Sequence, residues 1–567
     1  MTPRAPRFSL FVASLLLAAC APAHTTQAPS APAPAPVIAT RPESAAVAAT
    51  PKPSADPPAS VNAHEAARNW QLLDEATDHV AGISAERAYR ELLAGRQPKR
   101  TVVVAVIDGG VDTSHADLRA NLWLNPKETA GNGKDDDGNG YVDDMRGWNF
   151  IGGKDGKDVQ WDTYELTRVY VRCKKSPPAV ATEKQRCKSI ADDLDKRRAD
   201  AQASLAEIDQ AGATLDQVTT VLKAALKTDT LTVSGVAAFR PMSQDLQRAR
   251  DLYLRIADAG ITAQVVKENR ESVKNTLERG LNPDFDPRPI VGDDYANPNE
   301  RRYGNSDVMG PDAKHGTHVA GIIGAVRGNS LGIDGVDGNV GAVKIMSVRT
   351  VPDGDERDKD VANAIRYAVD NGASVINMSF GKGYSPYKGV VDDAVKYADA
   401  HGALLVHAAG NEGADLAVSK NFPTPVFQGG GRAQNWIEVG ASSWKGLDSL
   451  ATSFSNYGKE LVDVFAPGED ILSTVPGGGF ERESGTSMAA PVVTGLAAML
   501  MSYYPNLTAA EVKRIILASV TKHGDQMVVK PGSSGEKVLF GSLSATGGIV
   551  NAYSAVKMAE AMSAQRP

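Results

Sequence analysis

Five largely apolar runs restrict the fold of this chain more than any other feature. The first, "TVVVAVIDGG", begins at Thr101 and ends in Asp108 and two glycines, and the later ones are "AVKIMSVR", "SVINMSF", "ALLVHAAGN" and "WIEVGA". Strands of a parallel sheet are buried on both faces, so their side chains are apolar throughout instead of alternating. Helical patterns at 359–371 and 390–401 lie between some of the runs. We therefore predict an α/β fold, a doubly wound parallel sheet with helices on both faces and its site at the strands' carboxyl ends.

Residues 151–310 interrupt this alternation. From about 182 to 281 the chain is rich in Ala, Leu and charged residues, which is typical of amphipathic helices, with breaks expected at "GATLD", "KTDTLTVSG" and "ADAGIT". We predict an α-helical insertion over 151–310 that separates a first part of the α/β domain (61–150) from a second part (311–525). A C-terminal segment, 526–567, follows. The length of 567 residues suits one large domain with an insertion.

The N-terminus has the pattern of an export signal. Arg4 and Arg7 precede an apolar run over 8–19, whose twelve positions are too few to span a bilayer, so residues 1–19 are predicted to be a signal peptide. The sequence "LAAC" ending in Cys20 resembles the lipobox of bacterial lipoproteins, in which the cysteine becomes the first mature residue and carries the lipids. The alternative is an ordinary small-residue cleavage site that happens to end in cysteine.

Residues 20–60 consist largely of Pro, Ala and Ser and cannot bury a core, so we expect a disordered tether. The lipobox resemblance implies an exported protein whose lipidated Cys20 anchors it to a bacterial cell-envelope membrane, at the outer membrane or the cell surface. Ordered sequence is expected from about Asn62, with an amphipathic helix from about Ser84 to Ala94.

The two remaining cysteines, Cys173 and Cys187, lie 14 positions apart in the predicted insertion. An exported protein meets oxidising conditions, which favours a disulfide between them, although two free thiols are the alternative. The formal net charge is -7, and this mild acidity gives no reason to expect nucleic acid as a partner.

Four polar residues stand where strands or loops reach the carboxyl edge of the predicted sheet: Asp108 in "AVIDGGVD", His315 in "KHGTHVAGIIG", Asn411 in "HAAGNEG" and Ser487 in "SGTSMAAP". Taken singly, each could be a turn, cap or structural residue. Taken together, the order Asp, His, Ser is one of the known orders of a nucleophilic triad. His318, three residues after His315 on the same predicted helix, is interpreted as a packed or hydrogen-bonded structural histidine.

Each residue type suits one chemical role. A serine hydroxyl becomes a nucleophile when a base takes its proton, and His315 is the candidate base. Asp108 would hold the imidazole in one tautomer and stabilise its protonated form. The side-chain amide of Asn411 and the backbone N–H of Ser487 would donate to the oxyanion, which forms beside the positive end of the predicted helix.

The blocks around these residues resemble a known family. "VIDGGVDTSHADL", "HGTHVAG", "AAGN" and "GTSMAAPVVTG" are similar to the signature blocks of the subtilisin-like serine peptidases, the subtilases, and occur in that family's order over roughly 100–150 and 312–520. The resemblance implies a subtilisin-like sheet and a serine endopeptidase that hydrolyses peptide bonds through an acyl-enzyme, with no cofactor for the chemistry. Proteins or peptides would be its substrates.

The same resemblance implies the residues that bind substrate. The backbone of Ser379, Phe380 and Gly381 in "NMSFG" would pair with the substrate chain, and this mode of pairing tolerates many sequences. A pocket for the side chain that precedes the scissile bond would be lined by three small residues of the "AAGN" block, Ala408, Ala409 and Gly410.

Two calcium sites are predicted. "DDDGNGYVDD" offers Asp135, Asp137, Asn139 and Asp143 at the spacing of an EF-hand loop, but its twelfth position is Arg146 in place of glutamate. Another carboxylate such as Asp144 would have to complete that site, and a solvated acidic turn is the alternative. The subtilase resemblance adds Asp117 and Asn329 as ligands of a second, stabilising calcium. Both sites would be structural, and no Cys or His cluster indicates zinc.

Two features depart from the subtilase pattern. Residues 61–100 are too short for the folded inhibitory prodomain of many secreted members, and 207 positions separate Asp108 from His315. We hypothesise that the insertion limits access to the cleft or recruits a partner protein. A catalytically silent interaction protein with a subtilase fold is the alternative function. An esterase is disfavoured because Ser487 lacks the Gly-x-Ser-x-Gly context and the triad order differs.

Overall fold

The computed structural model describes residues 66–565, so the predicted signal peptide, Cys20 and the tether lie outside the described residues. The described chain forms two compact units. The first comprises residues 66–203 and 271–565, and the second comprises residues 204–270.

The first unit is built on one nine-stranded sheet with the strand order β10-β13-β7-β6-β5-β4-β1-β3-β2. All neighbouring strands from β13 to β2 run parallel, and only the edge pair β10 and β13 is antiparallel. The five predicted strands are all present, and the α/β fold class is confirmed. The strands are β1 (Val102–Asp108), β2 (Gly147–Asn149), β3 (Val343–Arg349), β4 (Ala373–Met378), β5 (Leu404–Ala408), β6 (Trp436–Ser442), β7 (Val464–Pro467), β10 (Thr521–Lys522) and β13 (Gly548–Ile549).

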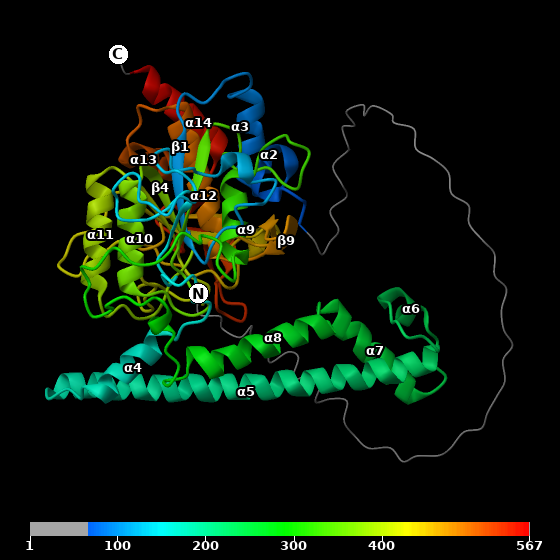
Figure 1. The fold of residues 1–567 in the computed structure, drawn as a ribbon. Helices are drawn as coiled ribbons and strands as arrows, with labels where there is room; N and C mark the ends of the chain where they lie inside the picture. The colour runs from blue at the N-terminus through cyan, green and yellow to red at the C-terminus, as the bar shows by residue number, and fades with distance from the viewer. Residues whose placement is uncertain (1–65, 566–567) are drawn as a thin grey trace. The chain divides into compact units, whose positions relative to one another are not determined.

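Strand β1 shows why these strands are largely apolar. Val104 and Val106 point into one hydrophobic core, and Ala105 and Ile107 point into another. Helices from opposite faces of the sheet close the two cores, as Figure 1 shows: α9 (Lys314–Gly324) and α12 (Thr486–Tyr503) on one side, α10 (Asp358–Asp370) and α11 (Lys388–Ala400) on the other.

The position of β1 defines the functional edge of the sheet. It pairs with β3 on one side and with β4 on the other, so the chain changes its winding direction beside β1. Open α/β sheets bind ligands at the carboxyl ends of strands next to such a switch point. The carboxyl end of β1 is Asp108.

The segments before and after the central strands complete the first unit. The indole of the fully buried Trp70 donates to the carbonyl of Glu469 at 3.0 Å, and α14 packs against α3 and α13. The C-terminal segment therefore belongs to the main core. These elements are η1 (Trp70–Leu72), α2 (Glu75–Asp78), α3 (Ala85–Glu91), η2 (Arg119–Asn121), η4 (Arg288–Ile290), η5 (Leu447–Ser449), β8 (Ile471–Val475), β9 (Gly479–Glu483), α13 (Ala509–Ala518), β11 (Met527–Val529), β12 (Lys537–Leu539), η6 (Phe540–Ser542) and α14 (Ala552–Ala564).

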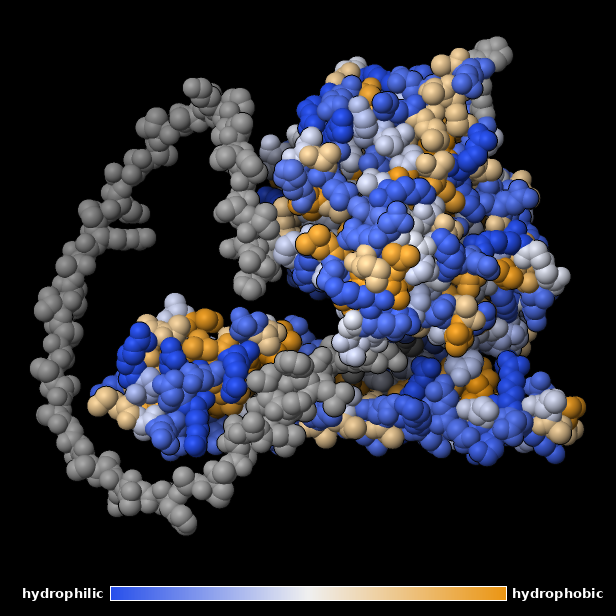
Figure 2. Space-filling view, turned by 180° about the vertical axis from the view of Figure 1, so that it is seen from behind, coloured by the Kyte–Doolittle hydropathy of each residue, from blue (hydrophilic) through white to orange (hydrophobic). Residues whose placement is uncertain are grey.

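Helix α12 is also the helix that, within the described residues, is long and apolar enough to cross a membrane. The whole of this apolar stretch is buried inside the first unit, and buried core helices of soluble proteins often have the same length and composition. On the face drawn in Figure 2, the apolar residues of the described chain are scattered among polar and charged ones.

The insertion enters the first unit through α4 (Glu165–Lys175), the beginning of α5 (Ala181–Leu226) and the π-helical turn η3 (Thr276–Gly280). A disulfide joins Cys173 of α4 to Cys187 of α5, with the Cα atoms 5.8 Å apart. At the start of α4, Glu165 forms an ion pair with Lys382 at 3.1 Å, and both side chains are almost fully buried.

The second unit contains the end of α5, α6 (Val233–Ala238), α7 (Gln244–Asp258) and most of α8 (Ala263–Asn275). Predicted breaks at "KTDTLTVSG" and "ADAGIT" are confirmed, with positive φ at Lys227 and Gly260. The predicted break at "GATLD" is wrong, because α5 continues through Gly212. One glycine inside a helix costs only about 1 kcal/mol, which the neighbouring Ala, Leu and Gln residues and the packing of α5 on α8 can offset.

Candidate active site

Asp108 and His315 form a hydrogen-bonded pair at the carboxyl edge of the sheet. Nδ1 of His315, in the first turn of α9, lies 2.8 Å from Oδ1 and 3.0 Å from Oδ2 of Asp108. Asp108 is 2% exposed, and its Oδ1 also accepts the backbone N–H of Gly109 at 2.7 Å. A Cβ at Gly316 would lie 2.1 Å from the carbonyl of Gly110, so a glycine there lets α9 approach β1 closely.

This contact fixes the histidine tautomer. With Nδ1–H donating to Asp108, Nε2 is the ring nitrogen that can accept a proton. Nε2 is buried and has no hydrogen-bond partner among residues 66–565. Burial lowers the pKa of His315, but the charge and hydrogen bond of Asp108, joined by the charge of Glu483, outweigh it and raise the pKa above the usual value.

Ser487 lies in the first turn of α12, which begins one residue earlier, at Thr486. Its hydroxyl donates to the backbone carbonyl of Ser379 at 3.2 Å, and its own carbonyl accepts the hydroxyl of Ser379 at 2.9 Å. Neither hydroxyl at the helix start caps α12, because the N-cap residue is Gly485 and no side-chain cap is present there. The hydroxyls of Thr486 and Ser487 therefore contact Gly410 and Ser379 at the candidate site and do not cap their own helix.

Asn411 provides the missing cap from another loop. Its Oδ1 accepts the backbone N–H of Thr486 at 2.8 Å and the hydroxyl of Thr486 at 3.0 Å. These contacts orient the amide so that its Nδ2 group is the available donor. Gly410, which precedes Asn411, has a φ of 103°, and a Cβ there would lie 2.4 Å from Nδ2 of Asn456, so the "AAGN" turn requires glycine.

The predicted substrate-binding residues lie around the same point. Ser379 and Phe380 follow β4 and are nearly buried, and a Cβ at Gly381 would lie 2.2 Å from Oδ1 of Asn421. Ala408 ends β5, and Gly410 donates its N–H to the hydroxyl of Thr486 at 3.1 Å. Ala409 is fully buried between them.

His318 is a structural residue, as the sequence indicated. It is fully buried in α9, and its Nε2–H donates to the carbonyl of Glu481 at 3.1 Å. Burial lowers its pKa, which favours the neutral imidazole.

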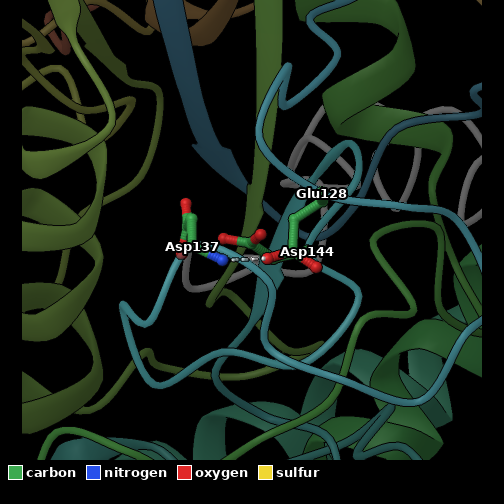
Figure 3. Close-up of side chains that lie close together, drawn as sticks. All are labelled: Glu128, Asp137 and Asp144. Carbon is green, nitrogen blue, oxygen red and sulfur yellow. Dashed lines mark hydrogen bonds between the residues drawn. The ribbon is translucent and has the colours of Figure 1, made fainter.

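The acidic loop forms a cluster that differs from the predicted ligand set. Single carboxylate oxygens of Glu128, Asp137 and Asp144 lie within 4.8 Å of one another (Figure 3). Glu128 is 8% exposed, and its Oε2 is buried with no hydrogen-bond partner within the described chain. Its Oε1 accepts the backbone N–H of Asp137 at 3.2 Å. An oxygen-only set with one unpaired buried carboxylate oxygen fits a hard cation such as Ca²⁺.

The other predicted loop residues have backbone or amide partners. Asp135 accepts the N–H groups of Asn139 and Gly140, so it shapes the turn. Asp143 accepts the N–H groups of Asn132 and Gly133 and is not part of the cluster. Asn139 lies at the border of the cluster, because its amide donates to Asp144 at 3.0 Å.

The second predicted calcium pair is also brought together. Nδ2 of Asn329 donates to Oδ1 of Asp117 at 2.6 Å, and the backbone N–H of Ile333 donates to Oδ2 of Asp117 at 3.3 Å. Asp117 is fully buried, and hydrogen bonds hold both oxygens of its carboxylate.

The sheet, the Asp108–His315 pair at its carboxyl edge and the serine in the first turn of α12 are arranged as in the class of α/β serine hydrolases with Asp, His, Ser order. The chain belongs to the subtilase family, whose model matches residues 99–531.

Several proteins of known name are similar to this chain. It is 42% identical over 221 residues to a thermophilic serine proteinase of Bacillus sp. (strain AK1), covering 39% of this chain and 49% of that protein. It is 38% identical over 217 residues to subtilisin of Bacillus pumilus, covering 37% of this chain and 72% of that protein.

Among solved structures, one of proteases from Pseudoalteromonas arctica aligns with a TM-score of 0.45 and 19% identity, covering 86% of this chain and 97% of the other. The chain spans about half the length of the first relatives it matches, 49% and 52%.

Sequence reasoning missed Glu128 and Thr486. Glu128 lies seven residues before Asp135, outside the spacing of an EF-hand loop, and only its position in "NPKETAGNGKDDDGNG" could have marked it. Thr486 is part of the "GTS" block, where its two contacts to Asn411 and Gly410 depend on the fold.

Proposed function

We propose that the protein is a serine endopeptidase that hydrolyses peptide bonds of proteins and peptides through an acyl-enzyme on Ser487. The observation that carries this proposal is the Nδ1 contact of His315 with both oxygens of the buried Asp108 at 2.8 and 3.0 Å. That contact leaves Nε2 as the base, at the edge of the sheet where α12 presents Ser487.

In the proposed reaction, Nε2 of His315 takes the proton of the Ser487 hydroxyl as its oxygen attacks the scissile carbonyl carbon. The hydroxyl must first leave the carbonyl of Ser379, its partner in this structure. Asp108 stabilises the imidazolium, which then protonates the leaving amine. A water molecule hydrolyses the acyl-enzyme by the same proton transfers in the second half of the reaction.

Charge on the substrate oxygen would be stabilised by two donors. Nδ2 of Asn411 is oriented by the bonds that its Oδ1 accepts from Thr486. The N-terminus of α12, with the backbone N–H of Ser487, supplies the second donor and a favourable dipole. The backbone of 379–381 would pair with the substrate chain, and residues 408–410 would border the pocket for the preceding side chain.

The proposal is tested by labelling with a fluorophosphonate probe, which reacts with activated serines. We expect the full chain to be labelled, and Ser487→Ala and His315→Ala to lose labelling and the hydrolysis of unfolded casein. Loss of either residue of such a unit costs about 10⁶ in turnover. A folded wild-type protein that is neither labelled nor active would favour the catalytically silent interaction protein.

We further propose a structural Ca²⁺ held by Glu128, Asp137 and Asp144, supported by the unpaired Oε2 of Glu128. Asp117 and Asn329 remain the second candidate. Export and lipid anchoring through Cys20, at a bacterial cell envelope, are supported by the sequence of residues 1–20 alone. A partner protein for the helical insertion likewise stays a proposal from the sequence.

A further inference from the structure

Three charged residues are linked by ion pairs that involve the sequence neighbour of His315, the base of the proposed reaction. Lys314, next to His315 in α9, pairs with Glu481 at 2.7 Å and with Glu483 at 3.4 Å. Glu481 and Glu483 lie on β9, and Glu483 is four residues before Ser487. We name these three residues the charged triplet. Its formal charge is -1, because two carboxylates share one ammonium group.

The β8–β9 hairpin is hydrogen-bonded to α9, which holds the backbone of Glu481 and Glu483 next to the helix that carries His315. The hydroxyls of Ser473 and Thr474 in β8 donate to the carbonyls of His318 and Thr317 at 2.7 and 2.8 Å. In return, Nε2–H of His318 donates to the carbonyl of Glu481 at 3.1 Å. These three bonds connect both strands of the hairpin to the helix that carries the base.

We propose that Glu483 is a positioning residue that, with Lys314 and Glu481, sets the pH at which His315 becomes a competent base. This inference rests on the proposed peptidase function. A carboxylate near the ring stabilises the imidazolium and therefore delays the loss of its proton as the pH rises. Lys314 acts in the opposite direction, and its two carboxylate partners weaken that effect.

The other charged groups near His315 do not account for the effect that we propose for Glu483. Asp108 is the direct partner, and its charge is part of the reaction itself. Among the elements packed against α9, neither α12 nor β8 carries a charged side chain. From β3, Arg349 donates to the carbonyl of Gly109 and to Asn149, and within α9 the neutral His318 is bonded to β9. The charge of Glu483, whose carboxylate pairs with the neighbouring Lys314, raises the pKa of His315.

The exposed fractions of the two glutamate side chains indicate which variants distinguish the effect of Glu483 from that of Glu481. The side chain of Glu483 is 21% exposed and that of Glu481 is 55% exposed. A partly buried charge is less screened by water than an exposed one. Glu483→Gln is therefore the test variant, and Glu481→Gln, on the same strand and with the same lysine partner, is the matched control.

The experiment measures the pH dependence of fluorophosphonate labelling of the full chain. We expect Glu483→Gln to move the acid limb to lower pH by roughly 0.3–1 unit, the effect of one half-screened charge. Glu483→Asp should restore most of the shift, Lys314→Gln should move the limb to higher pH, and Glu481→Gln should move it by less than half as much as Glu483→Gln.

A second measurement does not depend on activity. The imidazole of His315 is titrated by NMR in the Ser487→Ala background with ¹³C-labelled histidine, and His315→Gln identifies its signal. An acid limb and a titration that stay unchanged in Glu483→Gln, or that move equally in Glu481→Gln, would overturn the inference. Unlabelled wild type with a His315 titration that shifts in Glu483→Gln would contradict the proposed function alone.

Discussion

Asn411 carries two tasks in one side chain: its carbonyl oxygen caps α12 at Thr486, and its amide is the proposed oxyanion donor. We expect Asn411→Ala to lower kcat by about 10²–10³ with little change in KM, because the lost hydrogen bond forms in the transition state. Steady-state kinetics with a chromogenic peptide measures both constants.

The control separates the donor from the cap. Asn411→Asp keeps an oxygen for the N–H of Thr486 and removes the donor, so its kcat should fall at least as far as that of Asn411→Ala while its thermal stability stays closer to wild type. Recovery of kcat in Asn411→Asp would show that the cap, and not the donor, supports activity.

The buried Asp337 should make the free energy of unfolding depend on pH. It is fully buried among Tyr89 and Ser502, and burial raises the pKa of its carboxyl group to about 7. Between pH 4 and 7 the folded protein therefore holds a proton that the unfolded chain has lost. The free energy of unfolding should fall as the pH rises through this range, by up to about 1.4 kcal/mol per pH unit.

Asp337→Asn mimics the protonated carboxyl and should remove this slope, so that the variant gains stability relative to wild type at pH 8 and not at pH 4. Urea denaturation at both pH values measures the difference. A constant difference between the two proteins across pH would show that Asp337 is ionised in the folded state.

The sequence led to the candidate catalytic residues more directly than to the candidate metal ligands. Asp108, His315, Asn411 and Ser487 could be proposed because each follows a strand or lies at the start of a helix at one sheet edge, and parallel topology brings such ends together. Loop ligands depend on backbone conformation, which spacing alone does not determine. Asp143 has the spacing of a ligand, yet its carboxylate is used by two backbone N–H groups.

At the scale of elements, the beginning of α4 is joined to the end of β4 by buried charges. Lys382 forms ion pairs with Glu165 at 3.1 Å and with Asp358 at 2.8 Å, and all three side chains are 2–3% exposed. We expect Lys382→Met to destabilise the first unit by about 3–5 kcal/mol, because Asp358 stays buried without a cation and Glu165 keeps only Arg168 as its partner. Thermal or denaturant unfolding checks this.

The double variant tests the mechanism of that loss. If unpaired charge is the cause, Lys382→Met combined with Asp358→Asn should be more stable than the sum of the single changes predicts, since the second change removes the carboxylate that has lost its cation. Additive effects would indicate that the methylene packing of Lys382 matters more than its charge.

The elements themselves were predictable to different degrees. Long apolar strands and the helices between them appear where their periodicity placed them, because burial on both faces demands that composition. Strand β7 and the C-terminal strand β13 were not anticipated, since β13 has two residues and gains its place in the sheet only by pairing with its neighbours. The continuous α5 shows that packing overrides a local glycine signal.

For the whole molecule, calcium should contribute stability that chelation removes. A cation present at 100 times its Kd adds about 2.7 kcal/mol, so EDTA should lower the Tm by several degrees. The response should be lost in Glu128→Gln and kept in Asp143→Asn, whose carboxylate lies outside the cluster. If Asp117→Asn alone removes the response, the second candidate is the calcium site.

The insertion can be tested without damaging the first unit. Deleting residues 204–270 removes only the second unit, whereas deleting residues 160–300 would also remove Glu165 and its buried ion pair. Within that unit, Asp209 pairs with Arg270, and eleven positions earlier in α5, within the first unit, Arg198 donates to the carbonyl of Leu281, which follows η3. These pairs show that α5 and α8 run antiparallel, so a short Gly-Ser loop can join 203 to 271.

If the insertion limits access to the proposed cleft, the deletion of residues 204–270 should raise the rate of cleavage of folded protein substrates several-fold. The rate of cleavage of a short peptide should stay unchanged. A peptide diffuses past an obstacle that excludes a globular protein, so the ratio of the two rates reports access and is insensitive to the amount of active enzyme. Titration with the fluorophosphonate probe normalises both rates. Equal rates for both substrates before and after deletion would remove the access hypothesis and favour a binding role for residues 204–270.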